Sequence, residues 1–262
     1  MKFYKIINQV LGITDFGTMK NRCWDLFEIC GDQSADVTIS PICPDFINCD
    51  IQFASIFPGS KLMFSGSAVL CADEDYRHAF VYRGDAPSAL ETFAAYIFYT
   101  HAIRRQILWI HSAMIEVSGR WVLFIGPSGI GKTTQAERWA QFRGASIING
   151  DVGFVQRTQD GFLAWGTPWH GSSPYCLNTS VPLKALVVLK QAPYNALREL
   201  TGFEKLKEIS NNVFYPTWLE DGMELGVETL NHLLTELPVY RLDNRADLEA
   251  VELLERELNR IS

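Results

Sequence analysis

The sequence has no long uncharged apolar run, which argues against a helix that crosses a membrane. Its most apolar candidate helix, Ala89–Leu108, carries Glu91, His101, Arg104 and Arg105. A membrane-spanning helix needs ~20 largely uncharged residues. The first residues also lack the apolar stretch and small-residue cleavage site of a signal peptide. We therefore expect no membrane partner and a cytoplasmic location.

Positive charge is scarce: 23 Lys and Arg stand against 30 Asp and Glu, which gives a net charge of -7. An acidic surface disfavours nonspecific binding to nucleic acid, so we expect no nucleic-acid partner. A locally basic pocket remains compatible with this balance. With 262 residues, of which 47% are hydrophobic, the chain can bury a sizeable core without disulfides or metals.

Paired cysteines are also missing, because no two of the six cysteines form a C-x-x-C motif. They are Cys23, Cys30, Cys43, Cys49, Cys71 and Cys176. These spacings do not suit a zinc site. We interpret them as reduced cysteines of a cytosolic protein, with a metal or disulfide framework as the alternative.

Short apolar segments separated by Gly, Pro and Asp clusters fill residues 1–86. The expected strands are Phe3–Ile7, Trp24–Cys30, Ile51–Ile56, Ser67–Cys71 and His78–Arg83. The acidic run 73–75 is typical of a hairpin tip. We predict a small, mostly antiparallel, β-rich N-terminal domain over these residues.

Residues 87–262 mix helical and strand patterns and are expected to form the second domain. The expected strands are Ile107–Val117, Trp121–Ile125, Ala145–Asn149, Val152–Gln156, Phe162–Trp165, Leu183–Leu189 and Val239–Leu242. The expected helices begin at Ser88 and at Lys132, and others follow from apolar spacing over Leu197–Leu206, Leu225–Leu237 and Leu248–Leu258. The predicted class is α/β, with a mixed sheet that carries a phosphate-binding loop.

That loop is the most specific motif. The run Gly126-Pro127-Ser128-Gly129-Ile130-Gly131-Lys132-Thr133 fits G-x-x-x-x-G-K-[ST] at every fixed position, and Thr134 follows it. Its glycines leave backbone N–H groups free to wrap the phosphates of ATP. Lys132 reaches the β- and γ-phosphates in such loops, and Thr133 offers its hydroxyl to Mg²⁺. A buried-type strand before it and a helix after it oppose a chance match.

A carboxylate partner for Mg²⁺ is expected at the end of a nearby strand. Asp151 follows the apolar strand Ala145–Asn149, and Gly150 allows the chain to turn there. The other interpretation is an Asp that caps its own turn. We favour the metal site because of the position of Asp151 beside the loop.

From Ile110 to Asp151 the chain resembles the HPr serine kinase family and, more distantly, the ATP-type phosphoenolpyruvate carboxykinases. The shared features are Ile110-His111-Ser112-Ala113, the loop with its flanking strand and Ile147-Ile148-Asn149-Gly150-Asp151. Weaker similarity continues through Gly166-Thr167-Pro168-Trp169-His170-Gly171. The resemblance implies transfer of the γ-phosphate of ATP to a hydroxyl, often of serine, and places His111 beside the metal.

The chain departs from this family at one catalytic position. Two adjacent acids follow the strand in the kinases, whereas this chain has Gly150-Asp151. The general base therefore stays open between Asp151, His111 and His170. The loop around Trp169 and His170 is rich in glycine, proline and hydroxyls, which suits an adjustable substrate lid as well as an ordinary surface loop.

The sequence thus predicts an ATP- and Mg²⁺-dependent kinase with Lys132, Asp151, His111 and His170 as catalytic residues. The acceptor would be a small peptide, a small protein or free serine, and a homo-oligomer is compatible with the sequence. The alternatives are a nucleotide-binding regulatory or carrier protein without transfer, and a simple ATPase.

Overall fold

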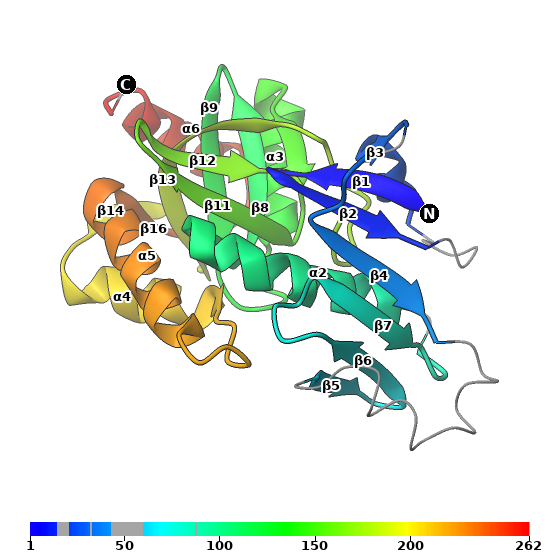
Figure 1. Ribbon diagram of the computed structural model, residues 1–262. Coiled ribbons are helices and arrows are strands. Elements are labelled where there is room, and N and C mark those ends of the chain that lie inside the picture. Colours follow the sequence, from blue (N-terminus) through cyan, green and yellow to red (C-terminus); the bar gives the residue numbers. More distant parts are fainter. Residues whose placement is uncertain (15–20, 32, 43–59, 87, 262) are drawn as a thin grey trace. The chain divides into compact units, whose positions relative to one another are not determined.

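The computed structural model describes residues 1–14, 21–31, 33–42, 60–86 and 88–261. It divides into two compact units, Met1–His101 and Ala102–Ser262 (Figure 1). The division expected from the sequence, 1–86 and 87–262, differs by the place of helix α2 (Ala89–Ala102), nearly all of which falls within the first unit.

The first unit contains one seven-stranded sheet with the order β3-β1-β2-β4-β7-β6-β5. Its strands are β1 (Lys2–Ile6), β2 (Gln9–Ile13), β3 (Glu28–Ile29), β4 (Val37–Pro41), β5 (Lys61–Ser65), β6 (Ala68–Ala72) and β7 (His78–Tyr82). The pairs β2–β4 and β4–β7 are parallel and the other pairs are antiparallel. The prediction of a mostly antiparallel β-rich region is confirmed for the described residues.

The strands predicted for this unit agree only in part with the strands of the structure. The strands predicted at Phe3–Ile7, Ser67–Cys71 and His78–Arg83 are confirmed as β1, β6 and β7. The strand predicted over Trp24–Cys30 is wrong for its first part, because Trp24–Leu26 belong to the 3₁₀ helix η1 (Arg22–Leu26), and only Glu28–Ile29 form a strand, β3. The Asn21 side chain caps η1 by accepting from the Cys23 N–H, a local bond that competes with strand formation. The predicted strand Ile51–Ile56 lies outside the described residues.

The second unit is built on a nine-stranded sheet. Its strands are β8 (Ile107–Val117), β9 (Arg120–Ile125), β10 (Ser146–Asn149), β11 (Val152–Thr158), β12 (Gly161–Trp165), β13 (Ser180–Gln191), β14 (Ala196–Leu200), β15 (Val213–Phe214) and β16 (Val239–Asn244). The pairings β8–β11, β11–β12, β12–β13, β13–β9 and β9–β8 close a ring. The sheet is therefore mixed, as the sequence predicts.

Three neighbouring strands of this sheet, β9, β13 and β16, run parallel. Helices α3 (Lys132–Arg143) and α6 (Leu248–Leu258) pack together with these strands around one buried cluster (Figure 1). Trp139, which is 1% exposed, and Phe124 contribute large side chains to this core. The residues that follow Ile125, the last residue of β9, therefore lie at one end of three parallel strands that pack against the buried core.

Two sequence-based expectations in this unit need correction. The helix predicted over Leu197–Leu206 is instead β14 followed by α4 (Phe203–Ile209), because Gly202 adopts a φ of 50° and separates the two. The sequence also allows Lys184, which opens a strand, either to neutralise phosphate charge or to be a solvated lysine, and the strand register excludes the first of these. Since β13 runs parallel to β9, Lys184 lies beside the start of β9, away from the loop that follows its end.

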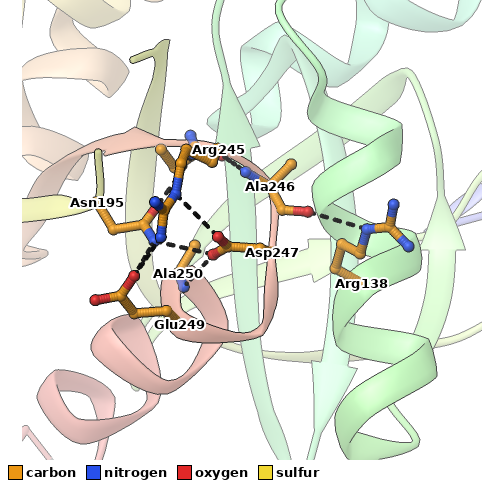
Figure 2. Close-up of polar contacts among 8 residues, drawn as sticks. Arg138, Asn195, Arg245, Ala246, Asp247, Glu249 and Ala250 are labelled. Carbon is orange, nitrogen blue, oxygen red and sulfur yellow. Dashed lines mark hydrogen bonds and ion pairs between the residues drawn. The ribbon is translucent and has the colours of Figure 1, made fainter. Parts of the chain in front are cut away.

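A polar cluster ties the segment between β16 and α6 to the rest of the unit (Figure 2). Asn195 donates to Asp247 and Glu249 and accepts from the Arg245 N–H. Asp247 caps α6 by accepting from the Ala250 N–H. Helix α3 joins this cluster because Arg138 Nε donates to the Ala246 carbonyl at 3.0 Å.

Ala246 in this cluster has a φ of 56°, a left-handed conformation that costs an L-residue ~1–2 kcal/mol. We expect Ala246→Gly to raise the free energy of unfolding by about 0.5–1 kcal/mol, after the extra entropy of glycine in the unfolded chain is subtracted. Urea unfolding measures this. The matched change Ala250→Gly, inside α6, should lower the free energy of unfolding by about 1 kcal/mol or more. A lower free energy of unfolding in Ala246→Gly would contradict the prediction.

The cysteines differ from the expected reduced set. Cys23 and Cys176 take part in disulfide bonds, whereas Cys30 and Cys71 are free. Cys43 and Cys49 lie outside the described residues. The prediction is wrong for the first two because disulfide pairing depends on distance in the folded chain, which spacing in the sequence does not reveal.

The described helices include none with both the length and the apolar character that crossing a bilayer requires.

Candidate functional site

The glycine-rich loop, residues 126–133, joins the end of β9 to the start of α3. Gly126, Gly129 and Gly131 have φ values of 152°, 79° and 106°, which L side chains rarely adopt. No described atom lies within 4 Å of a Cβ placed on Gly129 or Gly131. The backbone there is bare and accessible, which is what close approach of an anion to N–H groups requires.

The first turn of α3 presents further donors. Its first four N–H groups have no partner within the helix, and the capping residue Gly131 supplies no side-chain hydrogen bond. The partial positive charge at this end of the helix favours a bound anion. Ile130 is partly buried and packs against the core cluster of β9, β13, β16, α3 and α6, which anchors the loop.

Lys132 is buried, with 6% of its surface exposed. Its Nζ donates to the carbonyl oxygens of Gly126 at 3.0 Å and Pro127 at 3.3 Å. Burial lowers the pKa of Lys132, and the nearby charge of Asp151 opposes this shift. The Lys132 ammonium is hydrogen-bonded to carbonyls of the loop itself, and in that position it could donate to a bound anion instead.

A cavity of about 270 Å³ opens beside this loop. Its lining comes from the loop and α3, from the turn after β10 and from the segment after β12. The lining residues are Ser128, Gly129, Gly131, Lys132, Thr133, Thr134, Gly150, Asp151, Ser172 and Ser173. The sequence-predicted loop and Asp151 therefore share one cavity. Thr133 Oγ1 also donates to the Gly150 carbonyl at 3.1 Å, which joins the two walls.

Asp151 and His111 are brought together by strand register. Val152 pairs with His111 between β11 and β8, and the Ser112 N–H donates to the Asp151 carbonyl at 3.1 Å. A hydrogen bond of 2.7 Å links His111 Nε2 to Asp151 Oδ1. Both side chains are partly exposed, at 40% and 35%. The resemblance implies that His111 lies beside the metal, and the structure places it in contact with Asp151, the predicted metal ligand.

The segment that carries His170 is less adjustable than expected. Its residues 166–169 are buried, and Trp169 packs on Phe154 with a centroid separation of 5.9 Å. This half of the segment is packed into the core, and little of Trp169 is left for contact with a substrate. His170 is partly exposed and its Nδ1 lies 2.9 Å from the Gly171 carbonyl. Gly171 itself packs directly on the Asp151 carboxylate.

Gly150 stands where the kinase family has the first of its two adjacent acids, and the side chain of Ser173 takes up the space beside it. A Cβ on Gly150 would lie 1.9 Å from Ser173 Oγ and 2.8 Å from Ser173 Cβ. Any side chain at residue 150 therefore clashes with this serine, whose hydroxyl is buried and has no partner among the described residues. The structure leaves room for one acid at this turn, not two.

Sequence reasoning missed several residues at the site. Ser172 and Ser173 line the cavity, and their signal was the hydroxyl-rich run that follows Gly171. Gln191, at the end of β13, places Nε2 3.4 Å from the loop carbonyls of Gly129 and Ile130. No sequence signal marked Gln191, because its proximity depends on the parallel pairing of β13 with β9.

The residues present fit a nucleotide and a shared metal ion better than a metal bound by protein alone. Among the described residues, no three His, Cys, Asp or Glu side chains gather into a metal-binding group. Thr133 and Asp151, the predicted metal ligands, both line the cavity and offer a hydroxyl and a carboxylate. Mg²⁺ is commonly held in this way, with one or two protein ligands, and phosphate oxygens and water complete its shell.

The lowered pKa of Lys132 predicts a pH dependence of anion binding. The ammonium form is present below the pKa of Lys132 and is lost as pH rises through that pKa, which lies below the ordinary 10.5. We expect the affinity for a nucleotide triphosphate to stay level up to that pKa and then to fall by up to about tenfold per pH unit. Titration calorimetry between pH 7 and 10.5 measures this.

The control for this pH profile is Lys132→Arg, because a guanidinium stays charged throughout that range. Its affinity should show no step at this pH. A step at the same pH in both proteins would assign the titration to another group and contradict the role of Lys132.

The crowding at Gly150 predicts a stability cost. Gly150→Ala should lower the free energy of unfolding by about 1–3 kcal/mol through overpacking against Ser173. The same change made together with Ser173→Gly should cost much less, since the clashing atoms are gone. Urea unfolding of the four proteins in this cycle gives the coupling, and an equal cost in both backgrounds would contradict the contact.

Fold and cavity together define a mixed α/β protein with a glycine-rich loop at the entrance to a helix. Residues 90–243 match the family model described as SynChlorMet cassette protein ScmC. Because the match covers more than half of the 262 residues, the chain belongs to this family. Comparison with curated proteins finds no match.

Among solved structures, the chain is similar to the HPr(Ser) kinase/phosphatase from Coxiella burnetii, with 11% sequence identity. The alignment covers 58% of this chain and 88% of that chain, at a TM-score of 0.35.

Proposed function

We propose that this protein is a kinase that binds ATP with Mg²⁺ and transfers the γ-phosphate to a hydroxyl. The acceptor would be a serine of a peptide or small protein, or free serine. One observation supports this most: Lys132 and Thr133 form one wall of a cavity whose other wall carries Asp151, and Asp151 is bonded to His111. Groups for anion binding and metal binding thus line one cavity, and a group for proton transfer is hydrogen-bonded to one of them, Asp151.

The loop and Lys132 would bind the phosphates. Backbone N–H groups at the bare glycines and the ammonium of Lys132 would stabilise charge on the β- and γ-phosphate oxygens. Thr133 and Asp151 would hold Mg²⁺, which supplies further charge neutralisation when bound. Because the cavity is preorganised by β9, α3 and the turn after β10, most of the acceleration would come from positioning and electrostatics.

The proton of the acceptor hydroxyl would pass to the His111–Asp151 pair. A histidine hydrogen-bonded to a carboxylate is oriented and stabilised as it gains a proton. With the space at Gly150 taken up by Ser173, this pair would take the place of a second carboxylate. His170 is the other candidate, through Nε2, since its Nδ1 lies against the Gly171 carbonyl.

Incubation with Mg²⁺ and γ-labelled ATP tests the proposal. The acceptors are free serine and short serine peptides, and the expected result is label on an acceptor hydroxyl. Label released only to water would support an ATPase. Tight ATP binding without turnover would support a regulatory or carrier protein, the alternative favoured by the single acid at the turn.

A further inference from the structure

Asn149 is the last residue of β10 and lies two residues before Asp151. Its side-chain amide is fully buried, with 0% of the residue's surface exposed. The register of β10 on β8 shifts between Ile147 and Asn149, so the strand stops regular pairing where this residue stands. A buried polar side chain at such a point needs a complete set of hydrogen bonds to be tolerated.

Both ends of this amide are satisfied. Its Oδ1 accepts from the N–H groups of Asp151 at 2.9 Å and Val152 at 2.8 Å. Its Nδ2 donates to the carbonyls of Trp169 at 2.7 Å and Thr167 at 3.4 Å. Because the oxygen faces only donors and the nitrogen only acceptors, the orientation of the amide follows from the backbone around it.

The same amide therefore connects two segments that are distant in the sequence. One is the turn that carries Asp151, and the other is the segment that leads through Trp169 to Gly171. Gly171, at the end of the second segment, packs against Asp151, since a Cβ on Gly171 would lie 1.5 Å from Asp151 Oδ2. Asn149 thus holds the backbone of Asp151 directly and also holds the segment that confines its carboxylate.

We propose that Asn149 is a positioning residue that fixes the Asp151 carboxylate where it faces both the glycine-rich loop and His111. This rests on the proposed function, in which Asp151 holds the metal of bound MgATP. Asn149 lies behind the turn and does not itself line the cavity described above. Its loss should leave the contacts of the phosphates with the loop intact and weaken those that depend on Asp151.

Aspartate and alanine separate the two halves of this role. Asn149→Asp keeps oxygen acceptors for the Asp151 and Val152 N–H groups but loses the donors to Trp169 and Thr167. Asn149→Ala loses both sets. Gly171→Ala displaces the Asp151 carboxylate without touching the amide, because a methyl group there has no space beside it.

The test measures ATP affinity of the whole chain twice, in Mg²⁺ and in EDTA, alongside phosphate transfer to the acceptor. In the wild type, Mg²⁺ should strengthen binding. Asn149→Ala and Gly171→Ala should bind ATP in EDTA within about threefold of wild type but lose about 10- to 100-fold in the Mg²⁺ enhancement or in transfer, the usual range for residues that orient a metal ligand. Asn149→Asp should lie between them and wild type.

The matched control is Asn195→Ala, which removes an amide of similar bonding in the cluster at the β16–α6 connection. It should lower stability and leave the Mg²⁺ enhancement unchanged. Folding of each variant is checked by thermal unfolding.

The outcomes separate the two proposals. Wild-type protein that binds no MgATP overturns the proposed function and this inference with it. Wild-type protein that binds MgATP, with folded Asn149 and Gly171 variants that keep the full Mg²⁺ enhancement, overturns the inference alone. The binding readout decides the point even if no acceptor is found.

Discussion

Lys132→Ala should weaken ATP binding by at least about 100-fold. The variant removes a buried cation whose Nζ lies on the inner side of the glycine-rich loop, within reach of the Gly126 and Pro127 carbonyls. Hydrogen bonds to charged groups contribute about 1.5–3 kcal/mol each, and a loss of about 3 kcal/mol corresponds to this change in affinity. Isothermal titration with ATP or a nonhydrolysable analogue measures it.

Lys205→Ala is a matched control for this prediction. Lys205 belongs to α4, and its Nζ likewise donates to two backbone carbonyls, those of Leu234 and Leu237 at the C-terminal end of helix α5 (Gly222–Glu236). We expect it to lower stability and to leave ATP affinity within about twofold, since surface and helix-end charges have small, local effects. Unchanged affinity in Lys132→Ala would remove the loop from the proposed site.

Asp151→Asn should leave ATP binding in EDTA nearly unchanged and reduce phosphate transfer by about 100- to 1,000-fold, the range for loss of one preorganised electrostatic group. The amide keeps the shape of the carboxylate and can still bond to His111. It cannot supply the negative charge that a divalent cation and a protonated histidine require. Steady-state transfer at saturating ATP measures the loss, and the Mg²⁺ dependence of binding measures its cause.

Asp221→Asn is the control, because this carboxylate also pairs with a basic side chain, Arg104, in a different part of the unit. Transfer by this variant should stay near the wild-type rate. A fully active Asp151→Asn protein would exclude Asp151 from the mechanism and leave His111 or His170 as the base. Equal losses in both variants would point to a general effect on stability.

The sequence predicts the central part of the second unit well, because that part depends on local patterns. Strands β8 and β9, the glycine-rich loop and the start of α3 follow from apolar periodicity and glycine positions. The cavity shared by the loop and Asp151 follows from the motif and strand ends. These features need no knowledge of distant contacts.

What the sequence does not predict depends on tertiary pairing. Strand β10 is separated from β9 by β8, so Asp151 approaches the loop across two pairings and not one. The filling of the Gly150 position by Ser173 joins residues from two separate turns. The error over Leu197–Leu206 has a related cause, because leucine spacing alone does not reveal the break at Gly202. Each case needs a neighbour that only folding supplies.

Strand β8 pairs with different strands along its two edges: His111 pairs with β11 on one edge, and the next residue, Ser112, pairs with the last residue of β9 on the other. A shift of one residue in this strand would turn His111 to the opposite face of the sheet. Insertions and deletions within β8 or β9 should therefore be selected against. The turn at Ser118 and Gly119 lies at the far end of both strands, so chain length can vary there while the histidine, the carboxylate and the loop keep their mutual spacing.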